Sequence, residues 1–403
     1  MSPALDALDA PPAAAAAPGM GNPLARARAI GDLLERGGAF GDREHRLAPE
    51  VLEALHQADL FRMLVPREIG GAQADPQDYM ATIEALARCD GSAAWCVNQA
   101  SGVGMGSSHL PTEAARAIWG TPQGVACWGP PKPGVTMRAV PGGYRVTYEG
   151  SFASGSPHAT HIGGFVAVTE ADGSPRLMAD GKGELRAFLV PIGRAELWFD
   201  WDVIGLRGTG SNAYRLADVF VPAENTWVRD GDSPHPDPYF RLRANQVWAG
   251  GFASIALGLA QGMLDAFIEL AVHKIPRDEK NPIRENHVVQ HEVALAEAKL
   301  ASARLYFRDA LARFLAFLET APRATLDLRI AYRLAATHAI HSAREVGETL
   351  YDAAGTHAIF NDGPFARRYR DLRTVTQQLN GRKAHYHNVG RHLLGLPPAM
   401  IGF

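Results

Sequence analysis

The chain has 403 residues, of which 46% are hydrophobic and 21% charged, and its formal net charge is −3. This is the composition of a soluble globular protein, and the near-neutral charge gives no reason to expect nucleic acid or a membrane as partner. The length predicts two or three domains. Cys89, Cys96 and Cys127 lack metal-ligand spacing, and their odd number predicts a reducing compartment without a disulfide framework or metal site.

The N-terminal part is expected to be helical after a short tail. Residues 1–22 lack the basic and apolar regions of a signal peptide and predict a disordered tail. Residues 23–121 predict a helical domain, with Asp75 as an N-cap and a helix of small residues beginning at Gly91. The stretch Leu60–Pro66 is expected to be extended. No apolar run reaches the roughly 20 residues that span a bilayer, so we expect a cytoplasmic protein.

Residues 122–235 predict a β domain. Short runs of β-branched and aromatic residues alternate there with Gly, Pro and Asp, which is typical of an antiparallel β barrel or sandwich. Pro141-Gly142-Gly143 predicts a hairpin turn. The expected strands cover Val125–Trp128, Tyr144–Tyr148, Phe165–Val168, Leu185–Val190 and Tyr214–Val221.

Residues 236–403 predict a C-terminal four-helix bundle. Apolar residues recur at helical spacing in four long segments, which would pack as antiparallel neighbours. The fold class is therefore α+β, in the order helices, strands, helices. The four expected helices cover Val247–His273, Val288–Leu318, Ala324–Leu350 and Leu372–Leu394.

The stretch 150–165 concentrates residues that carry chemistry. It holds two hydroxyls, Ser154 and Ser156, and two imidazoles, His158 and His161, between two expected strands. Small polar residues and histidines held in this way suit the wall of a cofactor or substrate site. An ordinary Gly/Ser turn with surface histidines explains the same pattern equally well.

Several signatures in this order resemble the acyl-CoA dehydrogenase fold superfamily, over nearly the whole chain from about residue 24. The resemblance implies a flavin between the β domain and the bundle, and a homotetramer built on the bundle. It also implies that the charged cluster ending at Asp371 orients the last helix. The signatures are Leu64–Gly71, Ser154-Gly155 after a strand, Gly205–Ser211 followed by Asp218–Pro222, Pro364–Asp371 and Gly390–Gly395.

The catalytic glutamate of true acyl-CoA dehydrogenases has no counterpart after Arg370-Asp371. The matching position is about Leu379, which cannot act as a base. Asp265 and Glu269 lie on the earlier helix that can carry the base instead. An acyl-CoA dehydrogenase with a displaced base and a non-catalytic homologue therefore stay open as alternatives.

The elements Gly208-Thr-Gly-Ser211 and Phe152-Ala-Ser-Gly-x-x-His-Ala159 look more like the two-component (group D) flavin-dependent monooxygenase branch. Members take reduced FMN or FAD from a separate flavin reductase and use O2, through a C4a-hydroperoxide, to oxygenate a small molecule. The chain has no Gly-x-Gly-x-x-Gly fingerprint opening a βαβ unit, consistent with the lack of its own NAD(P)H site.

The resemblance assigns roles toward the flavin. Ser154, or Ser156, would hold flavin N5 without adding a charge, and His158 would bond the flavin or help to deprotonate substrate. Trp128 would pack at the isoalloxazine edge, and Arg277 would reach a flavin phosphate across a subunit interface. The structural alternatives are a turn serine, a histidine satisfied by backbone, a core tryptophan and a solvated arginine.

On the substrate side, two histidines of the aromatic hydroxylases in this branch are missing. Their regions read Cys96–Val103 and Gln378 here, so Asn98, Gln99, Ser101 and Gln378 could bind a polar substrate but not deprotonate it. Oxidation at sulfur or nitrogen therefore gains weight over phenol hydroxylation. His109 could replace a missing histidine, the role of His161 stays open, and Thr209 is expected at the pocket rim.

Overall fold

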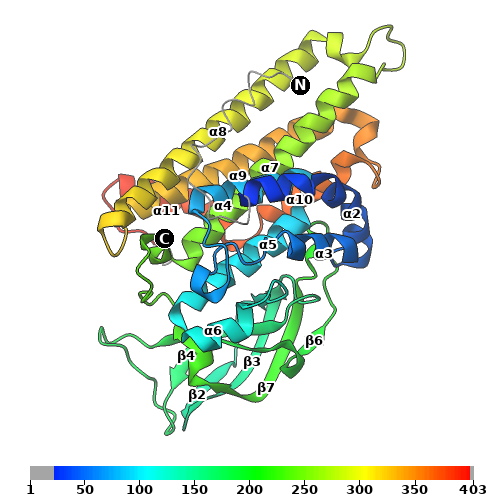
Figure 1. The fold of residues 1–403 in the computed structure, drawn as a ribbon. Helices are drawn as coiled ribbons and strands as arrows, with labels where there is room; N and C mark the ends of the chain where they lie inside the picture. Colours follow the sequence, from blue (N-terminus) through cyan, green and yellow to red (C-terminus); the bar gives the residue numbers. More distant parts are fainter. Residues whose placement is uncertain (1–21, 400–403) are drawn as a thin grey trace.

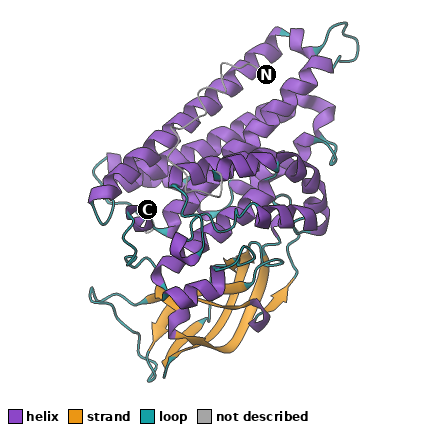
Figure 2. Ribbon diagram, in the orientation of Figure 1, coloured by secondary structure: helices purple, strands orange, loops and turns teal. Residues whose placement is uncertain are grey.

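The computed structural model describes residues 22–399 and arranges them in three layers (Figure 1). The long C-terminal helices form the upper layer, the N-terminal helices the middle one and the sheet the lower one (Figure 2). The predicted N-terminal tail lies outside the described residues except for Asn22. That residue caps the first helix, because its Oδ1 accepts a hydrogen bond from Leu24 N at 2.8 Å.

The N-terminal helices begin where short polar side chains cap them. Asp75 accepts a bond from Gln77 N, as predicted, and Asp90 accepts one from Ala93 N, both at 2.7 Å. Leu60–Pro66 forms buried turns instead of the extended segment that was expected, because its apolar residues are drawn into the helical core. The helices are α1 (Pro23–Ala29), α2 (Gly31–Glu44), α3 (Pro49–Gln57), α4 (Pro76–Cys89), α5 (Gly91–Gly104) and α6 (Thr112–Trp119).

The β domain is one sheet with the strand order β6-β7-β3-β2-β4-β5-β8, and β1 pairs with β4. The Pro141-Gly142 hairpin joins β2 to β3 as predicted, with Val140 opposite Gly143. The sheet is mixed, which corrects the expectation of a purely antiparallel one. The strands are β1 (Ala126–Trp128), β2 (Thr136–Val140), β3 (Gly143–Ala153), β4 (His161–Thr169), β5 (Leu185–Pro191), β6 (Glu196–Trp198), β7 (Asn212–Pro222) and β8 (Thr226–Val228).

The segment 154–160 is the reason for the mixed sheet. It joins β3 to β4, which lie on either side of β2 in the strand order, and β4 pairs with β2 in parallel, with Met137 opposite Val168. β4 also pairs in parallel with β1, where Ala126 faces His161. The serine and histidine loop is therefore the link between the two halves of the sheet.

The bundle consists of three long helices and a broken fourth. Glycines on α7 allow its close approach to α4: a Cβ at Gly258 would lie 2.2 Å from Glu84 O, and one at Gly262 would lie 2.3 Å from Arg88 O. The expected helix Leu372–Leu394 is interrupted, because Asn380 and Gly381 form a turn held by side chains of α9. The helices are α7 (Ala244–His273), α8 (His287–Thr320), α9 (Leu326–Ala354), α10 (Pro364–Val375) and α11 (Ala384–Leu393).

A buried ion-pair cluster joins α10 to the rest of the protein. Arg367 Nη1 lies 2.5 Å from Asp90 Oδ2, at the start of α5. Asp371 Oδ1 accepts a hydrogen bond from Leu206 N at 2.5 Å, which fixes the loop before β7. Arg368 pairs with Glu35 of α2. The cluster thus ties α10 to the N-terminal helices and to the β domain.

α7 is also the one helix within residues 22–399 that is long and apolar enough to cross a membrane. The sequence expectation that no run reaches this length therefore needs correction. However, 61% of its most apolar window is buried inside the protein, packed against α4, α5 and α9, as in the core helix of a soluble protein.

Candidate active site

Ser154 lies at the end of β3, where the sheet meets α5. Its hydroxyl oxygen accepts a hydrogen bond from Trp95 Nε1 at 2.9 Å and lies 2.7 Å from Ser211 Oγ. Ser154 is 5% exposed, so the hydroxyl is held in an almost dry place. Trp95 and Ser211 thus hold the Ser154 hydroxyl in one orientation, and it carries no charge toward a bound ligand.

The neighbouring loop before β7 supplies two more hydroxyls. Thr209 Oγ1 donates to Leu206 O at 2.8 Å and lies 2.6 Å from Ser211 Oγ. Thr209 is 1% exposed, so its side chain points into this hydroxyl cluster and not to an open pocket rim, where the sequence placed it. Ser156 is buried as well: its hydroxyl donates to Gly210 O and accepts from Asn212 Nδ2.

An aromatic pair, exposed Phe152 and half-buried Trp201, lies beside these hydroxyls, and Trp201 Nε1 donates to Leu206 O, which also accepts from Thr209. Phe152 adopts the left-handed backbone conformation, with φ of 61°, and its side chain is 59% exposed. Its ring meets Trp201 edge to face, with centroids 5.8 Å apart. This conformation falls where the pairing of β3 with β7 is irregular, between Gly150 and Ala153, and a β-bulge of this kind re-aims a side chain. Neither residue was singled out from the sequence, although both flank its Gly-Ser and Gly-Thr-Gly motifs.

His158 is half-buried in the same loop. Its ring packs against Phe61 at 5.4 Å, and its Nε2 is buried without a hydrogen-bond partner. Burial, together with nearby His56, lowers the pKa of His158 to about 3. His158 is therefore neutral at physiological pH, and its packing on Phe61 suits support of the loop.

This low pKa predicts an acid-sensitive loop. Between about pH 6.5 and 3 the unfolded chain binds a proton at His158 that the folded chain refuses, so stability falls as pH falls through this range. His158 contributes up to about 1.4 kcal/mol per pH unit to the change in the free energy of unfolding. His158→Phe should remove that contribution, as measured by urea unfolding midpoints across the range. Parallel pH profiles for the variant and the wild type would contradict the prediction.

The other two candidate histidines lie apart from the hydroxyl cluster. His161 is half-buried at the start of β4, and its Nδ1 lies 3.1 Å from Thr160 Oγ1. His109 follows α5, and burial, then nearby Arg243, lowers its pKa to about 4. Burial also lowers the pKa of His161.

One face of α5 meets a wall of tryptophans. Gly102 and Gly106 leave room for rings, since a Cβ would lie 2.2 Å from Trp248 Nε1 and 2.5 Å from Trp227 Cζ2, respectively. Trp128, half-buried at the end of β1, stacks on Trp227 with centroids 6.0 Å apart and meets Trp248 at 5.5 Å. Trp227 and Trp248 are 7% and 8% exposed, so half-buried Trp128 is the ring of this wall with surface left for a planar apolar ligand.

The polar residues of α5 divide between its two faces. Asn98 and Ser101 are fully buried: Asn98 Oδ1 accepts from Tyr79 Oη at 2.7 Å, and Ser101 Oγ donates to Phe61 O. Gln99 is only half-buried and, by helical spacing, shares the face of Trp95 and Gly102. Of the three predicted substrate residues on α5, Gln99 is the one placed toward the aromatic wall.

Two further predicted residues lie elsewhere. Gln378 follows α10; its Oε1 accepts from Asn380 N, while its Nε2 is buried without a partner. Arg277 is exposed in the loop between α7 and α8, at the end of the bundle far from the sheet in Figure 1. Within one subunit the structure therefore does not bring Arg277 to Ser154.

The positions that would carry an acyl-CoA dehydrogenase base offer no poised carboxylate. Leu379 begins the turn after α10 and is 50% exposed. Asp265 pairs with Arg88 at 2.6 Å, and Glu269 is exposed on the outer part of α7. Asp265 is engaged by its ion pair and Glu269 is exposed to water, so neither carboxylate stands free in a site closed to water.

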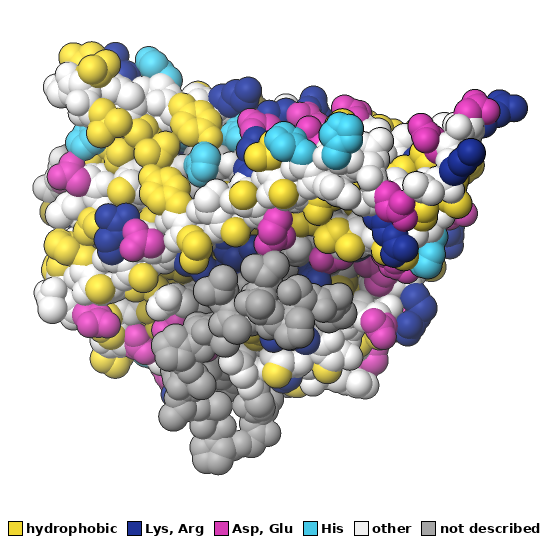
Figure 3. All heavy atoms as spheres, turned by 90° about the horizontal axis from the view of Figure 1, so that it is seen from above, with side chains coloured by type: hydrophobic (Ala, Val, Ile, Leu, Met, Phe, Trp, Pro, Cys, Tyr) yellow, Lys and Arg dark blue, Asp and Glu magenta, His cyan; other side chains and the backbone are white. Residues whose placement is uncertain are grey.

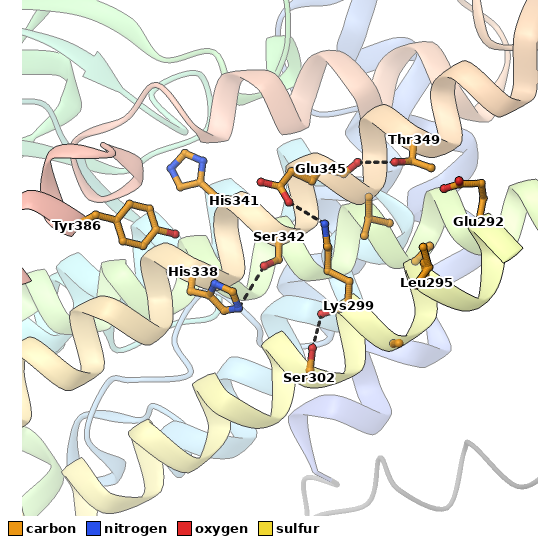
Figure 4. Close-up of a pocket in the computed structure, with 13 residues that line it drawn as sticks. Glu292, Leu295, Lys299, Ser302, His338, His341, Ser342, Glu345, Thr349 and Tyr386 are labelled. Carbon is orange, nitrogen blue, oxygen red and sulfur yellow. Dashed lines mark hydrogen bonds and ion pairs between the residues drawn. The ribbon is translucent and has the colours of Figure 1, made fainter.

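A groove of about 480 Å³ lies away from these residues, between α8 and α9 (Figure 4). Lys299 of α8 pairs with Glu345 of α9 at 2.8 Å, and Ser342 Oγ lies 3.4 Å from His338 Nε2. Tyr386 of α11 closes one end. His341 Nε2 lies 2.9 Å from Gly381 O and its Nδ1 is buried without a partner, whereas Lys299 and Glu345 neutralise each other.

Comparison with known proteins defines the class. The N-terminal domain model of the acyl-CoA dehydrogenases matches residues 36–122, and their C-terminal domain model matches 250–380, together more than half of the chain. The chain belongs to the acyl-CoA dehydrogenase family.

Within this family the similar proteins are monooxygenases. An indole-3-acetate monooxygenase of Pseudomonas putida is 29% identical over 89% of this chain and 90% of its own. The oxygenase subunit HsaA, a flavin-dependent monooxygenase of Mycobacterium tuberculosis, is 27% identical over 88% of this chain and 90% of its own. The oxygenase component of an FADH2-dependent resorcinol hydroxylase from Rhizobium sp. is 26% identical over 93% of this chain and 94% of its own.

Solved structures share the fold. XiaF from Streptomyces sp., in complex with FADH2 and glycerol, superposes with a TM-score of 0.85 at 21% identity, covering 94% of this chain and 97% of that one. A 3-HSA hydroxylase from Rhodococcus sp. RHA1 gives a TM-score of 0.83 at 23% identity, covering 93% and 97%. The three-layer architecture is therefore that of known members.

Proposed function

We propose that this protein is the oxygenase component of a two-component flavin-dependent monooxygenase. It takes reduced FMN or FAD from a separate reductase and oxygenates a small aromatic or sulfur-containing molecule. When bound, the reduced flavin supplies the two electrons with which dioxygen is divided into one oxygen atom for the substrate and one water molecule.

The observation that carries this proposal is the uncharged hydroxyl cluster around Ser154. A neutral oxygen in a nearly dry place can hold flavin N5 and keep water away from it. The exposed ring of Phe152 beside it offers a surface against which a flat ring system can pack. These features fit a flavin, and Leu379 stands where a dehydrogenase would need its carboxylate.

The substrate side follows from the aromatic wall. Trp128, Trp227 and Trp248 favour a planar substrate, and Gln99 can add one hydrogen bond to it. The indole-3-acetate and resorcinol enzymes among the relatives act on aromatic molecules by their names. Aromatic rings and aromatic sulfur compounds are therefore the first substrates to test.

A homotetramer built on the bundle belongs to the same proposal. Figure 3 shows hydrophobic side chains among histidines and charged groups on the face of the molecule seen from above. Val288, Leu295 and Leu305 of α8 are each more than half exposed, which a partner subunit would cover. Such an assembly would let Arg277 reach a flavin phosphate of another subunit. Light scattering on the eluting protein tests the assembly.

The experiment for the activity uses purified protein and an added flavin reductase. We expect reduced FMN or FAD to bind, and expect an oxygenated product with indole-3-acetate or dibenzothiophene when O2 is admitted. Tightly bound yellow FAD that bleaches on addition of an acyl-CoA would instead establish a dehydrogenase. Failure to bind flavin in either redox state would leave a non-catalytic homologue.

The close fit of α5 to the tryptophans predicts a steric effect on substrate binding. Gly102→Ala puts a methyl group 2.2 Å from Trp248 Nε1, so the side chain of Trp248 must move away from α5. The moved ring would then occupy space that a substrate packed on Trp128 needs. We expect the KM for an aromatic substrate to rise about tenfold while reduced-flavin affinity is kept. An unchanged KM would show that this part of the wall does not face the substrate.

A further inference from the structure

The hydroxyl cluster has a fixed direction of hydrogen bonding, and this direction reaches Ser154. Leu206 O is a carbonyl and can only accept; Thr209 Oγ1 donates its single proton to it at 2.8 Å, and Trp201 Nε1 donates to the same oxygen at 3.1 Å. Thr209 Oγ1 must then accept from Ser211, whose oxygen lies 2.6 Å away.

The same reasoning continues along the chain of hydroxyls. Because the proton of Ser211 is donated to Thr209, Ser211 Oγ accepts from Ser154 at 2.7 Å. Trp95 Nε1–H can only donate, and it does so to Ser154 Oγ at 2.9 Å. All four hydrogen bonds are made together in this one arrangement.

Ser154 is thereby left with one free lone pair and no free proton. A third partner of this oxygen has to be a hydrogen-bond donor. N5 of a flavin carries a hydrogen when the flavin is reduced, and offers only a lone pair when it is oxidised. The free lone pair of Ser154 matches the reduced form.

We infer that Thr209, Ser211 and Trp95 are positioning residues that make Ser154 selective for reduced over oxidised flavin. The inference rests on the proposed function, because it takes Ser154 as the partner of N5. For Ser154 to donate to oxidised flavin, the hydrogen bonds to Ser211 and Thr209 have to reverse their direction. The bond from Thr209 to Leu206 O is then lost. Such a loss weakens binding of the oxidised form by about tenfold.

The arrangement would serve the reaction. An oxygenase takes up reduced flavin and releases oxidised flavin. A site that binds the reduced form more tightly favours both uptake and release. Here the preference would come from the direction of a neutral hydrogen-bond chain, without any charged side chain at the ring.

The test compares affinities for the two redox states. Oxidised and reduced FMN and FAD are titrated anaerobically against the wild type, Ser211→Ala and Thr209→Val. Either change frees the proton of Ser154 to point at N5, so the ratio of oxidised to reduced dissociation constants should fall about tenfold. By linkage, the midpoint potential of the bound flavin should fall by about 30 mV for this two-electron couple.

Thr82→Val is the matched control. Thr82 is fully buried in α4, and its hydroxyl donates only to Asp78 O, so the ratio and the potential should stay at wild-type values. An unchanged ratio in both cluster variants, with flavin still bound, would overturn the inference and leave the proposed function standing. A wild type that binds neither redox state would overturn both.

Discussion

Replacing Ser154 with alanine is expected to uncouple the enzyme. The variant would consume reduced flavin and O2 but release most of the oxygen as hydrogen peroxide, because it lacks the hydroxyl that we propose as the partner of N5. We expect oxygenated product per reduced flavin to fall about tenfold, the effect of one hydrogen bond at the reacting ring. Peroxide and product are measured side by side after a single turnover.

Ser156→Ala serves as the comparison. It removes a hydroxyl from the same loop, but one whose hydrogen bonds to Gly210 O and Asn212 stay within the protein. Its product yield should therefore fall less than that of Ser154→Ala, while its thermal midpoint falls by a similar amount. Equal loss of coupling in the two variants would point to the shape of the loop, and full coupling in Ser154→Ala would make Ser154 only a turn residue.

Replacing Arg367 with methionine is expected to give the largest loss of stability. Arg367 and its partner Asp90 are 8% and 4% exposed, so the change leaves a buried carboxylate without its cation. Removing one partner of such a pair costs about 3–5 kcal/mol. The free energy of unfolding from urea titrations measures this loss.

Arg88→Met is the matched control for this prediction. Arg88 pairs with Asp265 at 2.6 Å, but the two side chains are 52% and 36% exposed. Exposed pairs contribute about 0–1 kcal/mol because water screens them. Similar losses in both variants would mean that packing of the long arginine side chains, and not the buried charge, sets the effect.

The order of helices and strands could be predicted from the sequence because it depends on local patterns. Asp75 marks a helix start and Pro141-Gly142 a hairpin by their own chemistry. The parallel pairing of β4 could not be predicted in this way. It depends on where the loop 154–160 carries the chain, and a period-two pattern does not tell which neighbour a strand will choose.

The candidate site was predicted in part for the same reason. Ser154 stands in a recognisable motif, whereas its partners Trp95 and Ser211 are 59 and 57 residues away and meet it only through the fold. For the loop before β7, which carries the other two hydroxyls, the sequence Thr209-Gly-Ser211 was the one pattern that could have indicated a site. The inward turn of Asn98 and Thr209 depends on their contacts with Tyr79 and Leu206, which helical spacing alone does not supply.

The connection 154–160, which joins strands on either side of β2, has a consequence for how the protein folds. Parallel pairs between distant strands form late, because the chain must first give up the entropy of the connection. The serine loop therefore reaches its final shape only when the two sheet halves have joined. A ligand that binds this loop favours the joined state by mass action. Reduced flavin in the refolding buffer should accordingly raise the yield of native protein, and a nascent chain would complete its sheet and its cofactor pocket in the same event.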